Sequence, residues 1–238
     1  MKVLITGGHG LLGSEIRKLD PRLIAPTAAE LDITDPAAIE AAIKKYQPDV
    51  VLHLAAMTKP PEHEKDPIPG LRVNIIGSAN VAIACQRANI KLVYTSSDYV
   101  YSGAGPHRED EPVSSPYRFG WSKLGGEFAV RMVDRHLILR LSFGPAPFPW
   151  EKVYEGQWNS KLYVDEMAPL VLAAAQSDAT GIMNIGGPRS TLEDYARRTR
   201  TDITTIPKPD WVPADTSLDI TKMKQALRIS DERTLLKH

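Results

Sequence analysis

Cysteine is almost absent from this chain of 238 residues, which has only Cys85. A single cysteine excludes an intramolecular disulfide, so the fold must depend on a buried apolar core, which a chain of this length can supply. Such cysteine usage fits a reducing compartment, and we expect a cytoplasmic protein. Cys85 lies in the apolar helical stretch NVAIACQRANI, where we expect a small buried hydrophobe rather than a reactive thiol.

An excess of either charge is also absent, because 29 basic residues balance 29 acidic ones. Nucleic-acid binding usually needs a basic surface, so we expect no nucleic-acid partner. No apolar run approaches the roughly 20 residues of a membrane-spanning helix. Since the sequence MKVLITGG leads straight into a strand, we expect neither a membrane partner nor a signal peptide. The run EHEKD (62–66) lies among prolines without metal-ligand spacing, which predicts a solvated loop and no metal site.

What the chain does contain is a regular alternation of short apolar runs with helical segments. The runs are apolar on consecutive residues, which is typical of strands buried on both faces. The expected strands are 2–6, 22–26, 49–55, 91–97 and 136–142, and the expected helices are 11–19, 35–46, 77–88 and 120–133. This order predicts an α/β fold with a Rossmann-type doubly wound parallel sheet.

The pattern changes after Ser142, where a segment rich in proline and aromatic residues has no clear period. Beyond it we expect a strand and helix in 162–177, a strand at 181–187, a helix at 191–199, a proline-rich connector at 206–219 and a closing helix at 220–228. We therefore expect a dinucleotide-binding domain at 1–142 and a small substrate-binding lobe at 143–238, interleaved with the end of the sheet. In the lobe, Trp150, Gln157, Trp158 and Asn159 suit either a base or sugar ring or simple loop packing.

The segment ITGGHGLLG follows the first strand and opens a helix, with glycines at positions 7, 10 and 13. Gly7 permits a tight turn, Gly10 lets backbone approach a pyrophosphate, and Gly13 lets the helix pack closely on the strand. The helix N-terminus then offers free N–H groups to an anion. An acid that selects NAD is expected about 20 residues further on, but Pro26 and Thr27 carry no charge, which favours NADP over NAD.

Eight segments together carry a family resemblance. They are TGGHGLLG (6–13), LDITD (31–35), HLAAMT (53–58), TSSDYVYSG (95–103), FGWSKLGGE (119–127), LYVDEMA (162–168), NIGG (184–187) and PADTSLDITKMKQAL (213–227). In this order they resemble the extended short-chain dehydrogenase/reductases, and within these the dTDP-4-dehydrorhamnose reductase group with its regulatory relatives. The family's usual insertion before the YVDE motif is trimmed here between Ser142 and Leu162.

The resemblance implies specific site residues. The implied contacts of an NADP or NAD cofactor are Gly7, Gly10, Leu11, Leu12, Gly13, Asp32, Ile33, Ala55, Ala56, Met57, Thr95 and Lys123. Ser97, Asp98 and Tyr99 would contact the substrate, with Ser97 at the position that polarises its oxygen. The same resemblance implies a nucleotide-sugar substrate, 4-keto reduction as the reaction, and a homodimer formed by the helix 120–133 and the one before it.

One catalytic position departs from the family, because Phe119 stands where the family has a tyrosine that protonates the substrate. Lys123 lies four residues on, so the two share a helix face, but a phenyl ring donates no proton. A relocated acid is one explanation, with Tyr99, Tyr101, Tyr117, His53 or a water on Ser97 as candidates. A cofactor- or sugar-binding regulatory protein and a deliberate Tyr→Phe change are the others. A sugar-nucleotide epimerase or dehydratase on the same scaffold also remains open.

Overall fold

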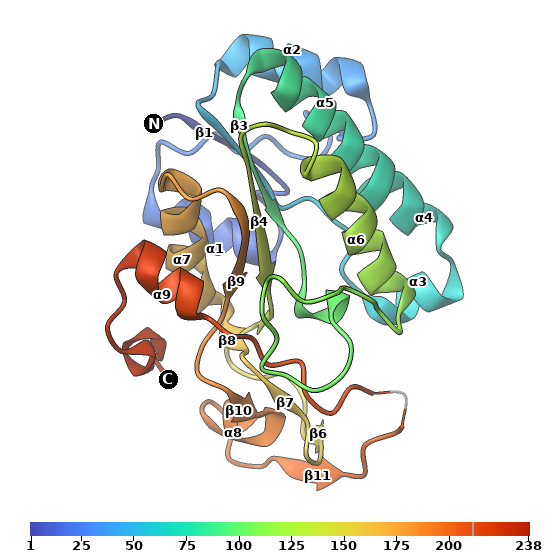
Figure 1. Cartoon of the computed structure of the whole chain (residues 1–238), viewed down its shortest axis with the longest axis vertical. Helices are drawn as coiled ribbons and strands as arrows, with labels where there is room; N and C mark the ends of the chain where they lie inside the picture. The colour runs from blue at the N-terminus through green and yellow to red at the C-terminus, as the bar shows by residue number, and fades with distance from the viewer. Residues whose placement is uncertain (211) are drawn as a thin grey trace.

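The computed structural model describes residues 1–210 and 212–238, and its centre is a five-stranded parallel sheet (Figure 1). In spatial order the strands are β1 (Val3–Thr6), β2 (Val50–His53), β3 (Lys91–Thr95), β4 (His136–Leu141) and β9 (Gly181–Ile185). Every neighbouring pair is parallel, and nearly all strand residues are buried. The structure therefore confirms the predicted Rossmann-type α/β fold.

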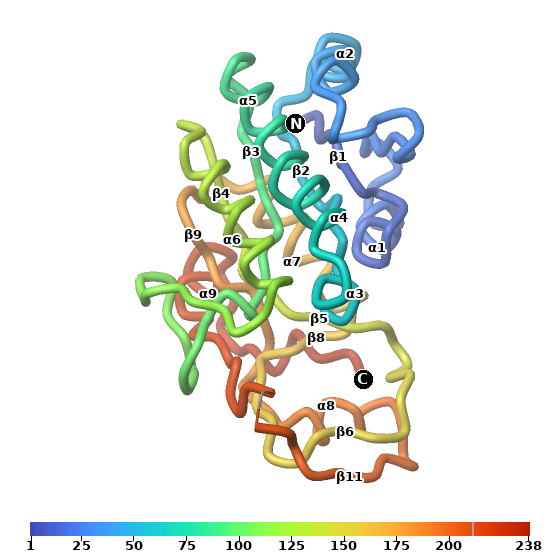
Figure 2. The backbone as a smooth tube through the Cα atoms, turned by 90° about the vertical axis from the view of Figure 1, so that its right-hand side faces the viewer, coloured from blue at the N-terminus to red at the C-terminus, as the bar shows by residue number. Residues whose placement is uncertain are grey.

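Helices cover both faces of the sheet (Figures 1 and 2). One layer holds α1 (Leu11–Leu19), α7 (Val164–Gln176) and α9 (Thr221–Leu227); the other holds α2 (Pro36–Tyr46), α5 (Ser78–Ala88) and α6 (Arg118–Val130). Two apolar clusters, one beneath each layer, form the core. The predicted buried cysteine is confirmed: Cys85 is fully buried in the second cluster, and burial raises its thiol pKa to about 12.

The helix before β3 is longer than the sequence pattern predicted. It runs without a break from α4 (Ile68–Gly70) through the π-helical turn η1 (Leu71–Gly77) into α5. This helix, Ile68–Ala88, has 21 residues, and its most apolar stretch has a mean hydropathy of 1.3, so it is long and apolar enough to cross a membrane. In this structure 44% of that stretch is buried inside the protein. The expectation that no apolar run reaches this length is therefore wrong. The helix packs on α2 and α6, as a core helix does.

Two short segments also differ from the prediction. The expected strand 22–26 reduces to one bridge, Ile24 to Leu4, because Pro21 and Pro26 flank it and proline cannot donate to a sheet. The expected loop 62–66 is instead helix α3 (Pro60–Lys65), since prolines in the first turn suit a helix start. Within the described residues no group of three or more potential metal ligands occurs.

The small lobe lies below the sheet in Figure 1 and is built from very short elements. These are β5 (Phe143–Gly144), β6 (Lys152–Tyr154), β7 (Trp158–Asn159), β8 (Leu162–Tyr163), β10 (Ser190–Thr191), α8 (Leu192–Arg197) and β11 (Thr204–Ile206). β6 pairs with β11, β7 with β10, and β5 with β8. One residue of the predicted connector, 211, lies outside the described residues. α7, β9 and α9 return to the sheet and its helical layer.

Candidate active site

A cleft of about 970 Å³ opens at the carboxyl edge of the sheet, between the loops that follow the strands and the small lobe. β1 and β2 end level, with Thr6 opposite His53, so the loops after them leave the sheet side by side. The strand order also switches sides here. The chain first forms the Ile24 bridge on one side of β1 and then crosses to form β2 on the other side. Such switch points are where open parallel sheets bind ligands.

Nearly all the residues that the sequence singled out line this one cleft. They are Gly7, Gly10, Leu11, Leu12, Gly13, Asp32, Ile33, Ala55, Ala56, Thr95, Ser97, Asp98, Tyr99, Phe119 and Lys123. Met57 is not among the lining residues. Its backbone is instead bound by Asn74, which donates to the Met57 carbonyl (3.0 Å) and accepts from its N–H (2.8 Å).

The glycine loop after β1 is shaped by close backbone contacts. Gly7 has a positive φ of 71°, and a Cβ there would lie 2.6 Å from the Ala55 backbone nitrogen. A Cβ on Gly13 would lie 2.6 Å from the Gly7 carbonyl oxygen. Helix α1 begins after Gly10 without a side-chain cap, so N–H groups of its first turn are free to bind an anion that enters the cleft.

Near the cleft lies Glu30, an acid that the sequence pattern missed and that is not among the lining residues. The chain turns back after Thr27, and the Glu30 carboxylate accepts from the Thr27 N–H (2.8 Å) and hydroxyl (2.9 Å). These hydrogen bonds lower the Glu30 pKa, so a negative charge lies at the end of the second strand segment. Because Glu30 is exposed and outside the cleft lining, the preference for NADP over NAD stays a prediction.

On α6, Phe119 and Lys123 both face the cleft and are 8% and 4% exposed. The Phe119 ring packs edge-on against His63 (5.4 Å between centroids) and Tyr99 (6.3 Å). Lys123 Nζ lies 4.3 Å from the centre of the Tyr94 ring. Burial lowers the pKa of Lys123 to about 7, although the Glu127 carboxylate opposes this change.

Ser97 and Asp98 form a hydrogen-bonded pair at the end of β3. The Ser97 hydroxyl donates to Asp98 Oδ1 (3.0 Å) and accepts from the Tyr99 N–H (3.1 Å). Thr216, from the tail before α9, donates its hydroxyl to Asp98 Oδ2 (2.8 Å). Both carboxyl oxygens are therefore engaged, and Asp98 is only 4% exposed.

Tyr101 and His53, two of the candidate substitute acids, are not among the residues that line the cleft. Tyr101 is outside the cleft lining; its hydroxyl donates to Asn184 (2.9 Å) and accepts from Arg140 (2.8 Å). His53 is a buried, satisfied strand-end histidine between the hydroxyls of Thr6 and Ser78, and burial with the nearby Lys123 lowers its pKa to about 3.

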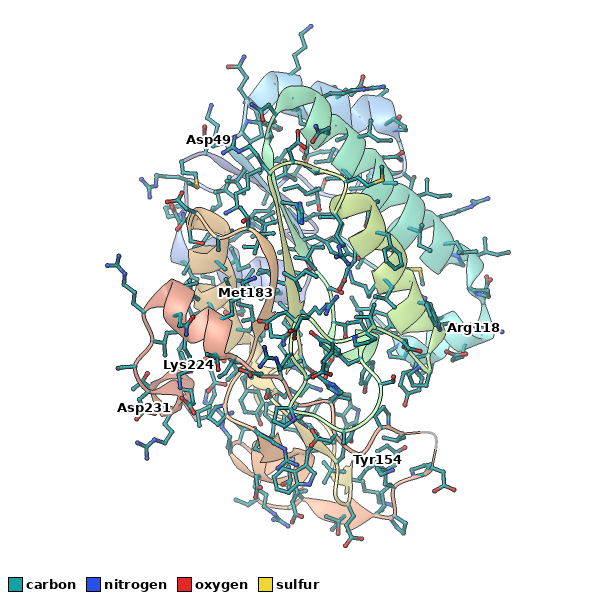
Figure 3. The ribbon with its side chains drawn as sticks, viewed as in Figure 1. Asp49, Arg118, Tyr154, Met183, Lys224 and Asp231 are labelled. Atoms are coloured by element: carbon teal, nitrogen blue, oxygen red, sulfur yellow. The ribbon has the colours of Figure 1, made fainter. Side chains whose placement is uncertain are left out.

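Tyr117 immediately precedes α6, and its ring lies 5.2 Å from that of Tyr99. Of the tyrosine candidates in the described residues, only Tyr99 lines the cleft. Figure 3 shows the surroundings of this end of α6, with Arg118 beside α3 and Tyr154 on β6 in the lobe.

Several lining residues were missed by sequence reasoning, because long-range folding alone brings them to the site. Lys161, Phe148 and Tyr195 come from the lobe. Of the lobe residues considered earlier, Trp150 lines the cleft, whereas Trp158 stacks on Arg189 with 3.8 Å between the guanidinium carbon and the ring centre. The position of Lys161, directly before the LYVDE segment, was the one available signal.

Comparison with known proteins gives three results. Residues 1–144 match the family model described as RmlD substrate binding domain. A dTDP-4-dehydrorhamnose reductase from Streptomyces griseus is 41% identical over 148 residues, which cover 59% of this chain and 49% of the relative. Methionine adenosyltransferase 2 subunit beta from Rattus norvegicus is 33% identical over 141 residues, covering 54% and 42%. The chain thus spans about half the length of these curated relatives.

A solved structure shares the fold along nearly the whole chain. The crystal structure of dTDP-4-dehydrorhamnose reductase from Bacillus anthracis, in complex with NADP, superposes with a TM-score of 0.85 at 23% identity. The match covers 94% of this chain and 93% of that one. The lobe and the sheet are therefore both part of the shared architecture.

Proposed function

The chain belongs to the RmlD substrate binding domain family, and from this we propose that it is an NAD(P)-dependent oxidoreductase that acts on a nucleotide sugar. The reaction we propose is 4-keto reduction, which the name of the Streptomyces griseus relative describes for that protein. The observation that carries the proposal is the single cleft in which an uncapped helix N-terminus, Ser97 and Lys123 all meet.

The cofactor end of the cleft is suited to a dinucleotide. We propose that the first turn of α1 binds the pyrophosphate, that Asp32 and Ile33 flank the adenine, and that Ala55, Ala56 and Thr95 line the path to the nicotinamide. When bound, the cofactor supplies the hydride. Lys123 would hold the nicotinamide ribose, and a ribose hydroxyl would give its buried amine a hydrogen-bond partner. We propose NAD(P) as the cofactor, with NADP slightly favoured because the second strand segment ends at the uncharged Pro26 and Thr27.

The substrate end of the cleft is lined by aromatic side chains of the lobe together with Lys161. Phe148, Trp150 and Tyr195 offer apolar ring faces, which suit a base or sugar ring. A lysine among them suits the diphosphate of a nucleotide sugar. We propose that Ser97, Asp98 and Tyr99 hold the sugar itself, with Ser97 at the reacting oxygen.

A second candidate function is supported by Phe119. A protein that binds cofactor and sugar without turning them over needs no acid at this position, and the chain is also similar to a subunit named as the beta subunit of methionine adenosyltransferase 2. Under this alternative the cleft is a regulatory ligand site. Saturable binding of both ligands without any turnover would distinguish it.

We also propose a homodimer and a cytoplasmic location. Apolar side chains are exposed on η1, α5 and α6 and on the residues after α6, and we propose that they form the dimer surface; they are Ile76, Ile83, Trp121, Phe128 and Met132. This surface would explain why the helix Ile68–Ala88 is apolar both toward the core and away from it.

The test is NADPH and NADH oxidation with a dTDP-4-keto-6-deoxy sugar, measured for the chain and for Phe119→Tyr. Turnover by the unaltered chain supports the reductase and requires another proton donor. Turnover by the variant alone means a reductase site that lacks its acid. Saturable cofactor binding with turnover by neither protein would favour the regulatory function.

A further inference from the structure

The hydrogen bonds around Ser97 raise a problem for its proposed role. Its hydroxyl proton is directed at Asp98 Oδ1, while its lone pair accepts from the Tyr99 N–H. A serine in this state has no proton to offer a carbonyl oxygen in the cleft. If Asp98 carries a proton, however, the bond reverses: the carboxylic acid donates to Ser97, and the serine O–H becomes free to turn toward the substrate.

We propose that Asp98, in its protonated form, is the proton source of this site and acts through Ser97. The inference rests on the proposed 4-keto reduction. It explains how a chain with Phe119 in place of the family's tyrosine can complete the reaction, and it assigns to Asp98 a task beyond contact with the sugar.

The step balances in atoms and charge. The hydride adds to the carbonyl carbon of the sugar, and the C=O π pair moves onto the oxygen. That oxygen takes the proton of the Ser97 hydroxyl, and Ser97 Oγ takes the proton of the Asp98 carboxylic acid. The products are the sugar alcohol, the oxidised cofactor, a restored serine and an Asp98 carboxylate, which regains its proton from solvent.

The groups around Asp98 suit both of its protonation states. Burial raises the Asp98 pKa, which keeps the acid protonated at higher pH than usual. Lys161 and the hydroxyls of Thr216, Ser97 and Ser142 act in the opposite direction and would stabilise the carboxylate after transfer. Of the other titratable side chains that line the cleft, Tyr99 follows Asp98 in the chain, Lys123 comes from α6 and Lys161 comes from the lobe.

The competing donors are less suitable. Burial and the neighbouring Asp98 raise the pKa of Tyr99, whereas an efficient general acid has a pKa near the working pH. Lys123 has a pKa of about 7, but its amine lies over the Tyr94 ring, 4.3 Å from the ring centre, and is the group that we propose holds the nicotinamide ribose. Among the titratable side chains of these three residues, that of Asp98 is the one hydrogen-bonded to the Ser97 hydroxyl.

The test compares Asp98→Asn in two backgrounds, the unaltered chain and Phe119→Tyr. Asparagine keeps the shape of Asp98 and can still donate to Ser97 and accept from Thr216, but it has no proton to transfer. We expect Asp98→Asn to slow turnover by about 10²–10⁴-fold in the unaltered chain, the usual contribution of a general acid. In Phe119→Tyr, where a phenol supplies the proton, the loss should be only a few-fold. Equal losses in both backgrounds would overturn the proposal, because a merely structural or sugar-binding role predicts them.

Two readouts do not depend on that comparison. Difference infrared spectroscopy of the cofactor-free protein, unaltered minus Asp98→Asn, should show the C=O band of a protonated carboxylic acid near neutral pH; a carboxylate band alone would overturn the proposal. Thr216→Val removes a hydrogen bond that lowers the Asp98 pKa, so the pH above which turnover falls should move upward, and an unmoved profile would contradict the relay.

The outcomes also separate this proposal from the reductase function. If Phe119→Tyr consumes cofactor and Asp98→Asn has no effect in the unaltered chain, the reductase function stands and the relay fails. If neither background consumes cofactor with the keto sugar, the reductase function fails, and the relay fails with it.

Discussion

Replacing Lys123 by methionine should stabilise the cofactor-free protein. Lys123 is 4% exposed, and burial lowers its pKa from the ordinary value of 10.5 to about 7. At about 1.36 kcal/mol per pH unit, its ammonium form costs the folded state ~5 kcal/mol. Methionine has a similar length and carries no charge, so Lys123→Met removes this cost and leaves the volume filled.

The gain should depend on pH in a defined way. Below pH 7 Lys123 is charged in both states, and the full cost is present. Between pH 7 and 10.5 the folded protein has released the proton while the unfolded chain keeps it. Unfolding therefore takes up a proton, and the free energy of unfolding of the unaltered protein rises with pH. The advantage of the variant should shrink from ~5 kcal/mol at about pH 6 to under about 1 kcal/mol at about pH 10.

Urea denaturation at these two pH values, without cofactor, measures the difference. Lys44→Met is a matched control, because Lys44 is exposed on α2 and its replacement should change stability by less than about 0.5 kcal/mol at either pH. A Lys123→Met protein that is less stable than the unaltered chain at low pH, or a gap that does not change with pH, would refute the reasoning. The same variant should bind NAD(P)H more weakly, because it lacks the amine that we propose holds the nicotinamide ribose. A buried lysine that lowers stability would then be retained for its function.

Three further predictions concern the scaffold. Glu127→Gln leaves Arg140 buried without its partner (both side chains are 1% exposed) and should lower the free energy of unfolding by ~3–5 kcal/mol in urea titrations; a loss under about 1 kcal/mol would mean the pair behaves like a surface salt bridge. Gly13→Ala places a Cβ 2.6 Å from the Gly7 carbonyl oxygen, so it should cost ~1–3 kcal/mol and weaken NADH binding in fluorescence titrations; unchanged affinity would argue against this loop as the cofactor site. Phe128→Lys charges an exposed apolar side chain of α6 and should yield monomers in sedimentation experiments; a monomeric unaltered chain would contradict the proposed dimer.

The sheet could be predicted from the sequence because each of its strands is a short run of consecutive apolar residues, bounded by turns or helices. The site could be located for a related reason. Gly7 follows β1 directly, and Ala55 and Ser97 lie two residues after the ends of β2 and β3; the carboxyl ends of parallel strands meet at one edge. Local pattern and topology together brought these residues to one cleft.

The remaining features depend on contacts that local pattern does not reveal. Lys161 reaches the cleft only through the folded lobe, and Thr216 reaches Asp98 only through the folded tail. Asn74 binds the Met57 backbone from a π-helical turn that has no simple sequence signal. Glu30 was missed because its carboxylate reaches the second strand segment only after the chain turns back.

Deuteride transfer tests the central claim most directly. The unaltered chain, in excess over a dTDP-4-keto-6-deoxy sugar, would be incubated with NADH or NADPH that carries deuterium at the transferable C4 position. Mass spectrometry and NMR of the sugar would follow. Reduction in this cleft predicts one deuterium at C4 of a sugar alcohol, even if turnover is slow. An unlabelled, unreduced sugar, recovered while both ligands still bind saturably, would contradict the reductase and leave a binding protein.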